Sequence, residues 1–338
     1  MHAHKDKRCF GESLVVEIII QNSLIYIMYI VIFLIIVVVT SCGLLFLGYS
    51  VWRSRFGRPA DNYIPILAYH KVDKKFELGG TWTTPGQFQK HMDYIKAKGI
   101  TPVTLSRAVE LMRSDESKNK KYVCLTFDDA YEGLYDYAWP ILQKHGFPAT
   151  IFVVTDYVGR ENDWDVNWGG RKFRHLGWKQ IAEMAEAGIE FGSHTRTHQD
   201  LRRLDDEELR NELAGAKNIL ENNLGKNIRT LSYPFGRYDQ RVIEAAGEYG
   251  YDAACSLSPQ MKNNQINFMA LRRSAVYITD IIWDYQNKIF QEGRFFWLQD
   301  LWCRMINFCA GGTIVAQNTI KLFRSKKRIF KGKFPQNP

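Results

Sequence analysis

The stretch YVCLTFDDAYEGLY, residues 122–135, decides how the rest of the chain is interpreted. Its apolar run from Tyr122 to Phe127 has the length of a buried strand. The run ends in two adjacent carboxylates, Asp128 and Asp129. Two like charges side by side repel each other unless solvent, a cation or a shared proton relieves them. The pair is therefore either a solvated turn or part of a site that binds a cation.

Short apolar runs alternate with amphipathic stretches through most of the chain after residue 61. This alternation is typical of βα units and a largely parallel sheet. We predict strands over 64–69, 100–104, 122–127, 149–154, 189–193, 228–233, 251–255 and 270–276. We predict helices over 84–99, 135–146, 177–188, 205–225 and 238–250. About seven such units favour an α/β barrel, over residues 62–278, more than an open sheet.

A second predicted strand also ends in polar residues that could bind a cation. The sequence IEFGSHTRTHQDL, residues 189–201, places His194 and His198 four residues apart. Because the carboxyl ends of parallel strands meet at one mouth, these imidazoles and Asp129 are expected to converge there. Two imidazoles and one carboxylate form a three-ligand set that catalytic zinc uses. Asp128 would then remain free to accept a proton from water as a general base.

A third predicted strand ends in a turn fixed by proline. The sequence IRTLSYPFGRYD covers residues 228–239. Such a turn can direct backbone N–H groups toward a developing oxyanion, although YPFG by itself indicates only a turn.

The order of these motifs resembles a known enzyme family. LTFDDAYEG, FGSHTRTH, SYPFGRYD and, more loosely, FMALRRSAV resemble successive motifs of the polysaccharide deacetylases, the carbohydrate esterases with a NodB-homology domain. The resemblance extends from about residue 64 to residue 276. It implies a distorted (β/α)7 barrel that hydrolyses N-acetyl, or less often O-acetyl, groups on a sugar polymer.

The resemblance also implies roles for individual residues. Asp128 would be the catalytic base, and Asp129, His194 and His198 would bind a divalent metal ion. Zn²⁺ is the first expectation, with Co²⁺, Ni²⁺ or Fe²⁺ as alternatives for this ligand set. Phe235 would give its backbone N–H to the oxyanion, with Tyr233 beside it as an oxyanion or substrate residue.

Two departures from the family pattern concern the catalytic acid and an arginine. Many members have an arginine before the proline turn, where this chain has Ser232, and a C-terminal histidine, whereas no histidine follows His198. His70, at the end of the first predicted strand, is the candidate acid. A catalytic acid that comes from the N-terminal strand resembles the arrangement in the branch of the family that contains poly-β-1,6-N-acetylglucosamine deacetylases. Arg273 is the candidate partner of Asp128, with Arg272 and Arg229 as rivals.

The N-terminal region predicts a membrane anchor. Residues 24–48 carry no charge, and about 20 such residues cross the hydrocarbon core of a bilayer. We expect a tail over 1–23, a transmembrane helix over 24–52 and a linker over 53–61. VTSC, ending at Cys42, resembles a lipoprotein cleavage site, but the apolar sequence continues beyond it. Basic residues flank the span on both sides, so its orientation stays open, and we place the barrel outside the cytoplasm from the expected substrate.

The C-terminal extension, residues 279–338, is aromatic at first and basic at its end. The aromatic part could pack on the barrel or lie at a membrane surface. The net charge of +9 suggests attraction to anionic surfaces, but nothing in the sequence indicates a nucleic-acid partner. The six cysteines are scattered, which argues against a structural zinc ribbon and a disulfide scaffold.

Three functions compete on these observations. The first is a membrane-anchored, metal-dependent N-deacetylase of an N-acetylhexosamine polymer, similar to poly-N-acetylglucosamine, in the cell envelope. The second is the same reaction on peptidoglycan, chitin fragments or a lipid-linked amino sugar. The third is a non-catalytic glycan-binding protein on the same fold, which the absent arginine and histidine would allow.

Overall fold

The structure is a computed structural model that describes residues 29–34, 37–41, 43–44, 48, 62–75, 77, 80–114, 116–119, 121–162, 172–257 and 265–291. The chain divides into two compact units, Met1–Gly57 and Arg58–Pro338. In the first unit the described residues are helical. Within the described part of the chain, no helix combines the length and the apolarity that a membrane crossing requires. The predicted tail and linker, and part of the predicted anchor, lie outside the described residues.

The second unit is built around one parallel sheet. Its hydrogen-bonded path runs β10-β9-β8-β7-β6-β5-β1-β11, and β4 pairs with β5 beside that path. A separate pair joins β2 to β3. The strands are β1 Ile66–Tyr69, β2 Lys71–Val72, β3 Trp82–Thr83, β4 Thr101–Val103, β5 Tyr122–Phe127, β6 Thr150–Val153, β7 Glu190–Ser193, β8 Thr230–Ser232, β9 Ala253–Ser256, β10 Leu271–Arg272 and β11 Ser274–Ala275.

The two ends of this sheet meet at Arg273. The predicted strand 270–276 is split there, because β10 pairs with β9 whereas β11 pairs with β1. The Arg273 N–H donates to the Ser256 carbonyl oxygen, as in the pairing of β10 with β9. Three residues later the Val276 N–H donates to the Ala68 carbonyl oxygen of β1. We call this junction, where the chain passes from pairing with β9 to pairing with β1, the seam of the barrel. When the split strand is counted once, the described path has the seven strand positions of the expected barrel, which is nearly closed.

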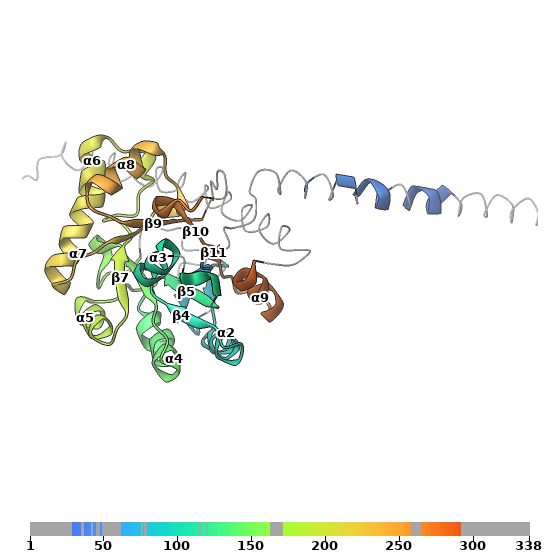
Figure 1. Ribbon diagram of the computed structural model, residues 1–338, viewed down its shortest axis with the longest axis horizontal. Helices are drawn as coiled ribbons and strands as arrows, with labels where there is room; N and C mark the ends of the chain where they lie inside the picture. Colours follow the sequence, from blue (N-terminus) through green and yellow to red (C-terminus); the bar gives the residue numbers. More distant parts are fainter. Residues whose placement is uncertain are drawn as a thin grey trace, which may run out of the picture. The chain divides into compact units, whose positions relative to one another are not determined.

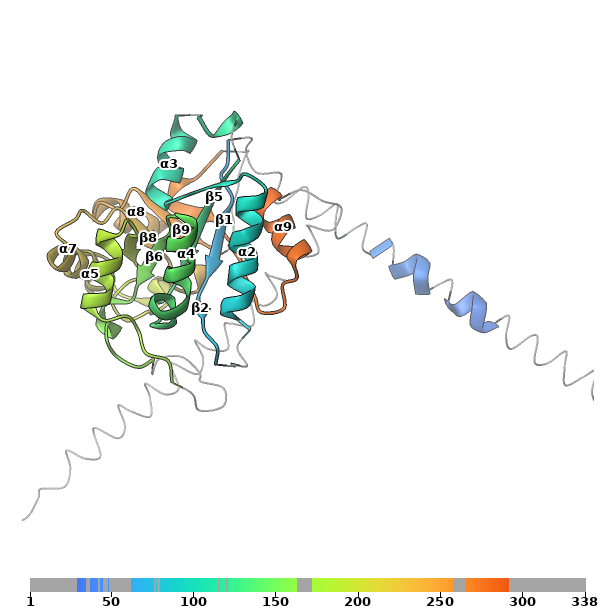
Figure 2. The same cartoon turned by 90° about the horizontal axis from the view of Figure 1, so that it is seen from below.

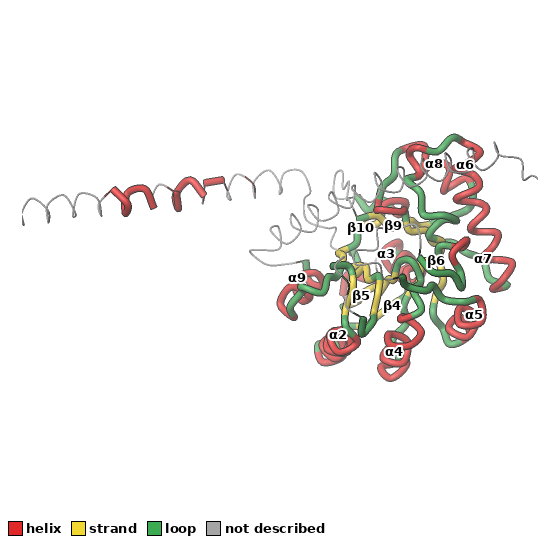
Figure 3. The backbone as a smooth tube through the Cα atoms, turned by 180° about the vertical axis from the view of Figure 1, so that it is seen from behind, coloured by secondary structure: helices red, strands yellow, loops and turns green. Residues whose placement is uncertain are grey.

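Helices surround this sheet, as the three views show (Figure 1, Figure 2 and Figure 3). They are α2 Pro85–Ala97, α3 Leu105–Arg113, α4 Trp139–His145, α5 Trp178–Glu186, α6 Asp206–Arg210, α7 Ala216–Leu224, α8 Gln240–Glu248 and α9 Ile282–Phe290. The buried side chains of all of them except α3 form one large apolar cluster with the outward-facing residues of the strands, such as Leu67 and Leu125. Two predicted helices contain π-helical turns, Leu134–Ala138 and Asn211–Gly215. The extra residue in each turn changes which side chains of the following helix face the core.

Helix α3, which the sequence pattern did not predict, covers one end of the barrel (Figure 2). Thr104 caps it by accepting a hydrogen bond from the Arg107 N–H, a signal that was available in the sequence. Its buried side chains, Leu105 among them, join a second apolar cluster with inward-facing strand residues such as Ile66 and Cys124. The end it covers is the one where the parallel strands begin, so the opposite end is left for a site.

The first part of the C-terminal extension packs on the barrel unit. Tyr285 of α9 stacks on His91 of α2 with 3.9 Å between ring centroids and 5° between planes. The buried Lys288 pairs with Asp280 ahead of the same helix. Residues 292–338, including the basic tail, lie outside the described residues.

Candidate active site

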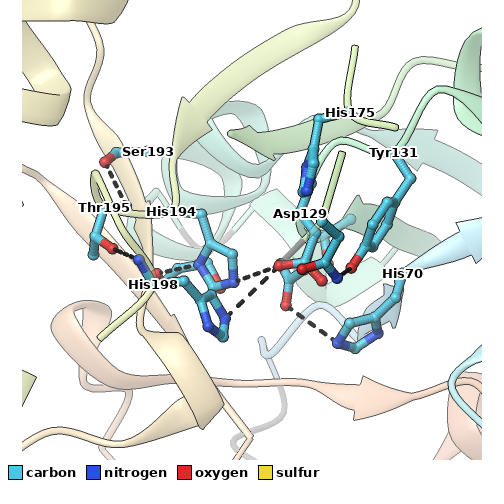
Figure 4. Close-up of polar contacts among 12 residues, drawn as sticks. His70, Asp129, Tyr131, His175, Ser193, His194, Thr195 and His198 are labelled. Atoms are coloured by element: carbon cyan, nitrogen blue, oxygen red, sulfur yellow. Dashed lines mark hydrogen bonds and ion pairs between the residues drawn. The ribbon is translucent and has the colours of Figure 1, made fainter. Parts of the chain in front are cut away.

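The predicted site residues gather where the parallel strands end. His70 follows β1, Asp128 and Asp129 follow β5, and His194 follows β7. Figure 4 shows His194 and His198 on one side of Asp129 and His175 on the other, with His70 close by. Residues from distant parts of the sequence therefore share one mouth, as expected for the carboxyl ends of a parallel barrel.

Asp129, His194 and His198 form a compact set of ligand atoms. Oδ1 of Asp129 lies 3.5 Å from Nε2 of His194 and 3.7 Å from Nε2 of His198. All three ligand atoms lie within 4.8 Å of one another, and all three residues are buried. Ligands bound tetrahedrally at 2.0–2.1 Å are separated by about 3.4 Å, so this spacing needs little change to bind a divalent ion.

The protonation of these histidines also suits a metal ion. Nδ1 of His194 lies 2.7 Å from the Ser232 carbonyl oxygen, to which it can bond only as an N–H donor. The lone pair of His194 is therefore on Nε2, the atom that faces Asp129. Burial lowers the pKa of His194 and brings the pKa of His198 well below its usual value, so both rings are neutral at neutral pH. The three residues therefore fit a divalent cation with two nitrogen ligands and one oxygen ligand.

Asp128 is bound by Arg273 through two parallel hydrogen bonds. Nη1 donates to Oδ1 and Nη2 to Oδ2, both at 2.7 Å. Arg273 also donates to the hydroxyls of Ser232, at 2.8 Å, and Thr126, at 3.2 Å. Burial alone would raise the pKa of Asp128, but the guanidinium outweighs it and holds that pKa far below its usual range.

The structure separates the three candidate arginines. Arg273 reaches Asp128, whereas Arg229 pairs with Asp252 at the surface. The backbone carbonyl of Arg272 accepts a hydrogen bond from the Tyr63 hydroxyl. Arg273 is therefore the arginine that binds the carboxylate of the candidate base.

His70 lies beside the candidate base. Its Nε2 is 4.0 Å from Oδ2 of Asp128, and its side chain is 19% exposed. Its Nδ1 is buried and has no hydrogen-bond partner among the described residues. Desolvation, against the opposing effect of Asp128, lowers the pKa of His70 to about 4. The imidazole is therefore neutral in the free protein at neutral pH.

The proline turn lies next to His198, one of the candidate metal ligands. The Phe235 ring packs edge-on against the His198 ring, with 4.6 Å between centroids. Tyr233 is buried; its hydroxyl donates to the Met269 carbonyl oxygen at 3.0 Å, and its N–H donates to the Cys255 carbonyl oxygen. These bonds give Tyr233 a part in fixing the turn.

Strained backbone is concentrated in these loops. Of the six non-glycine residues with positive φ among those described, five lie here, namely Asp129, Ala130, Thr195, His198 and Phe235. Such conformations cost of the order of 1–3 kcal/mol each and persist only where surrounding structure holds them. Their concentration independently marks this mouth as the functional region.

Two buried residues that the sequence did not single out hold these loops. Nδ1 of His175 donates to the Asp129 carbonyl oxygen at 2.6 Å, and the His175 ring stacks on Tyr131. Glu212 accepts hydrogen bonds from the segment between His194 and His198. A signal for Glu212 was present, because it lies among Leu209, Leu213 and Ala216 on the buried face of its helix, where carboxylates are rare.

Comparison with known proteins agrees with the geometry. The family described as Polysaccharide deacetylase matches residues 115–254. YxkH of Bacillus subtilis, named as a polysaccharide deacetylase, is 30% identical over 214 residues, which are 63% of this chain and 71% of that protein. The poly-β-1,6-N-acetyl-D-glucosamine N-deacetylase of Staphylococcus epidermidis is 28% identical over 213 residues, covering 60% of this chain and 69% of that one.

A solved structure shares the fold. The polysaccharide deacetylase BA0330 from Bacillus anthracis superposes with a TM-score of 0.55 at 26% identity, covering 67% of this chain and 68% of that one. The motifs that suggested the family are the segments that the fold brings to one mouth. The chain therefore belongs to the polysaccharide deacetylase family and is an enzyme, a hydrolase that removes acetyl groups.

Proposed function

We propose that the protein removes N-acetyl groups from an N-acetylhexosamine polymer of the poly-β-1,6-N-acetylglucosamine kind in the cell envelope. The observation that carries this proposal is the place of His70, which comes from the first strand of the barrel and lies 4.0 Å from Asp128. The sequence resemblance associates that position with the branch acting on this polymer. The S. epidermidis relative, named for the same substrate, supports the assignment at 28% identity.

The metal site belongs to the proposal. Asp129, His194 and His198 would bind the ion, with Zn²⁺ as the first expectation. A divalent ion bound there would supply a Lewis acid that polarises the acetyl carbonyl group and makes water more acidic.

Asp128 would act as the general base. Arg273 keeps its carboxylate ionised, so the group is ready at neutral pH to accept a proton from the attacking water. The same guanidinium fixes the orientation of the carboxylate, because two parallel bonds allow one planar arrangement. Water attacks the acetyl carbon, and the negative charge develops on the acetyl oxygen. The backbone N–H of Phe235, at the turn beside His198, would stabilise that charge.

His70 would deliver the proton that the departing amine needs. Since its pKa is about 4, the ring is neutral before reaction and must receive a proton during the cycle. Asp128, which has just taken a proton from water, lies 4.0 Å from His70 Nε2. Negative charge on the acetyl oxygen favours the imidazolium at that moment. The proton can then pass from His70 to the amine nitrogen as the carbon–nitrogen bond breaks.

We further propose that the enzyme is tethered to the membrane and acts outside the cytoplasm. The support is the uncharged sequence 24–48, which is long enough to cross a bilayer, together with the extracellular place of the expected polymer. Fractionation of cells that produce the full chain, followed by protease treatment of intact cells, tests both parts. Recovery of the full chain in the soluble fraction would contradict the tether.

Acetate release by the metal-loaded protein tests the substrate. We would compare poly-β-1,6-N-acetylglucosamine, chitin oligosaccharides and peptidoglycan, with Asp128→Asn as the inactive control. The proposal predicts release from the first polymer at the highest kcat/KM and none from Asp128→Asn. Preferential release from chitin or peptidoglycan would replace the substrate and keep the reaction. Binding of the polymer with no acetate release would favour the glycan-binding alternative.

A further inference from the structure

The segment that joins the two candidate metal-binding histidines rests on a buried carboxylate from another element. Oε2 of Glu212 accepts hydrogen bonds from the backbone N–H groups of Arg196 and Thr197, each at 2.9 Å. Oε1 accepts from the Thr197 hydroxyl at 2.5 Å and from Nε2 of Gln199 at 3.2 Å. Glu212 is 4% exposed. One side chain therefore satisfies three donors from the loop between His194 and His198 and a fourth from Gln199, directly after it.

This loop depends on such external support because its own conformation is unfavourable. Thr195 and His198 both have positive φ, at 67° and 56°. Within the loop, the Thr195 hydroxyl accepts a hydrogen bond from the His198 N–H at 3.2 Å. Two successive N–H groups that point to one anion form a concave binding site for negative charge. Glu212 provides that charge and so fixes the backbone between the two imidazoles.

The fold places Glu212 in this position through a π-helical turn. The turn Asn211–Gly215 joins α6 to α7, and its extra residue directs Glu212 inward beside the buried Leu213. Gly215 in the same turn lies close to the loop, since a Cβ there would come within 2.9 Å of Arg196 Cδ. A second, more exposed contact joins Arg196 to Asp156 through two hydrogen bonds of 3.0 Å.

We propose that Glu212 is a positioning residue that holds His194 and His198 at the separation a divalent ion requires, and thereby sets the affinity of the site for the ion. It touches neither the ion nor the substrate; it acts through the backbone of the loop. The inference rests on the proposed metal site. Partners behind the direct ligands typically change metal affinity 10–100-fold when they are removed.

Comparison with a second carboxylate that accepts four hydrogen bonds tests this role. Glu190 is the first residue of β7, the strand that His194 follows, and it is partly buried. It also accepts four hydrogen bonds, two from Ser106 and one each from Thr150 and Thr230. The dissociation constants of Zn²⁺ and Co²⁺ would be measured on the full chain in detergent, by competition with a chelator. The proteins are the wild type, Glu212→Gln, Glu190→Gln and Asp129→Asn.

We expect Glu212→Gln to weaken binding by about 10–100-fold and to alter the visible absorption of bound Co²⁺. Glu190→Gln should change the dissociation constant less than about threefold, although it also disturbs several hydrogen bonds of a carboxylate. Equal affinity of Glu212→Gln and the wild type would overturn the inference and leave the metal site intact. Failure of the wild type to bind either ion more tightly than Asp129→Asn would overturn the metal site itself, and the inference with it.

A second pair of variants decides the question if Glu212→Gln does not fold. Thr197→Val removes the hydroxyl that donates to Glu212, whereas Thr197→Ser keeps it. We expect Thr197→Val to weaken metal binding and Thr197→Ser to retain the wild-type affinity. Identical affinities for these two variants would count against the proposed role.

Discussion

Arg273 and Asp128 face each other at the seam of the barrel through two hydrogen bonds of 2.7 Å. Arg273 is the single residue between β10 and β11, where the sheet passes from one end of its path to the other. Ser232, at the position where many family members have an arginine, accepts a further hydrogen bond from Arg273. The residue that closes the barrel, Arg273, therefore supplies the positive charge beside Asp128 that an arginine at position 232 would otherwise provide.

Replacement of Arg273 by Gln is expected to lower kcat/KM by about 10²–10⁴-fold near neutral pH, the usual range for impaired acid–base catalysis. Arg273 depresses the pKa of Asp128, so its loss raises that pKa and reduces the ionised fraction in acid. The acidic limb of the profile of kcat/KM against pH should consequently move to higher pH.

Arg229→Gln is the matched control, because Arg229 pairs with Asp252 away from the site. It should leave the pH profile unchanged. A profile for Arg273→Gln that is reduced in height but not displaced would show that Arg273 orients Asp128 without tuning its charge.

The two adjacent aspartates are expected to fail in different ways. Asp128→Asn should abolish acetate release while the bound metal content stays near the wild-type level, because Asp128 binds Arg273 and not the imidazole pair. Asp129→Asn should lose both, since Asp129 is the carboxylate in the candidate ligand set. Metal content after dialysis, together with activity, measures the difference. Loss of metal from both variants to the same extent would contradict the division of roles.

His70→Gln should matter more for amides than for activated esters. A departing amine needs a proton, whereas a phenolate with electron-withdrawing groups leaves without one. We expect kcat on the polysaccharide to fall by about 10²–10⁴-fold and kcat on an activated aryl acetate to fall much less. The two substrates on one variant provide the control. Equal losses would point to a role for His70 in the shape of the site and not in proton transfer.

A buried histidine far from the mouth should make stability depend on pH. His91 is 2% exposed, and burial, with a smaller effect of Lys288, lowers its pKa to about 3. An unfolded histidine has a pKa near 6.5, so the unfolded chain binds a proton between pH 6.5 and 3 that the folded chain does not. Stability should therefore fall as the pH is lowered through this window, by about 2 kcal/mol from pH 7.5 to pH 5 for this one residue.

His91→Phe removes this titration and keeps an aromatic ring against Tyr285. Urea unfolding of the metal-free variant and the wild type at pH 7.5 and pH 5 measures the effect. The other buried histidines contribute equally to both proteins and cancel in the difference. The variant should lose less stability in acid, and equal losses would mean that His91 takes up its proton in the folded protein.

The amino-acid sequence by itself determined the chemistry and its order along the chain. The alternation of apolar runs and helical patterns predicted a parallel barrel, because hydrophobic periodicity is a local property. Asp129, His194 and His198 could be named in advance because they lie within five residues of the ends of apolar runs, and parallel strands bring their carboxyl ends together. The structure places the ligand atoms of all three within 4.8 Å of one another. The order of the motifs also indicated the family.

Tertiary structure alone decided which residues support that chemistry. The sequence offered Arg273 as the partner of Asp128 but left Arg272 and Arg229 as rivals, and the closure of the barrel brings Arg273 to Asp128. The cap α3 was missed because its apolar side chains face the inside of the barrel, a cluster drawn from distant strands. Glu212 meets the His194–His198 loop through long-range hydrogen bonds that no local pattern encodes. Such contacts depend on the three-dimensional closure of the chain, whereas the strands and ligands follow from the periodicity of short segments.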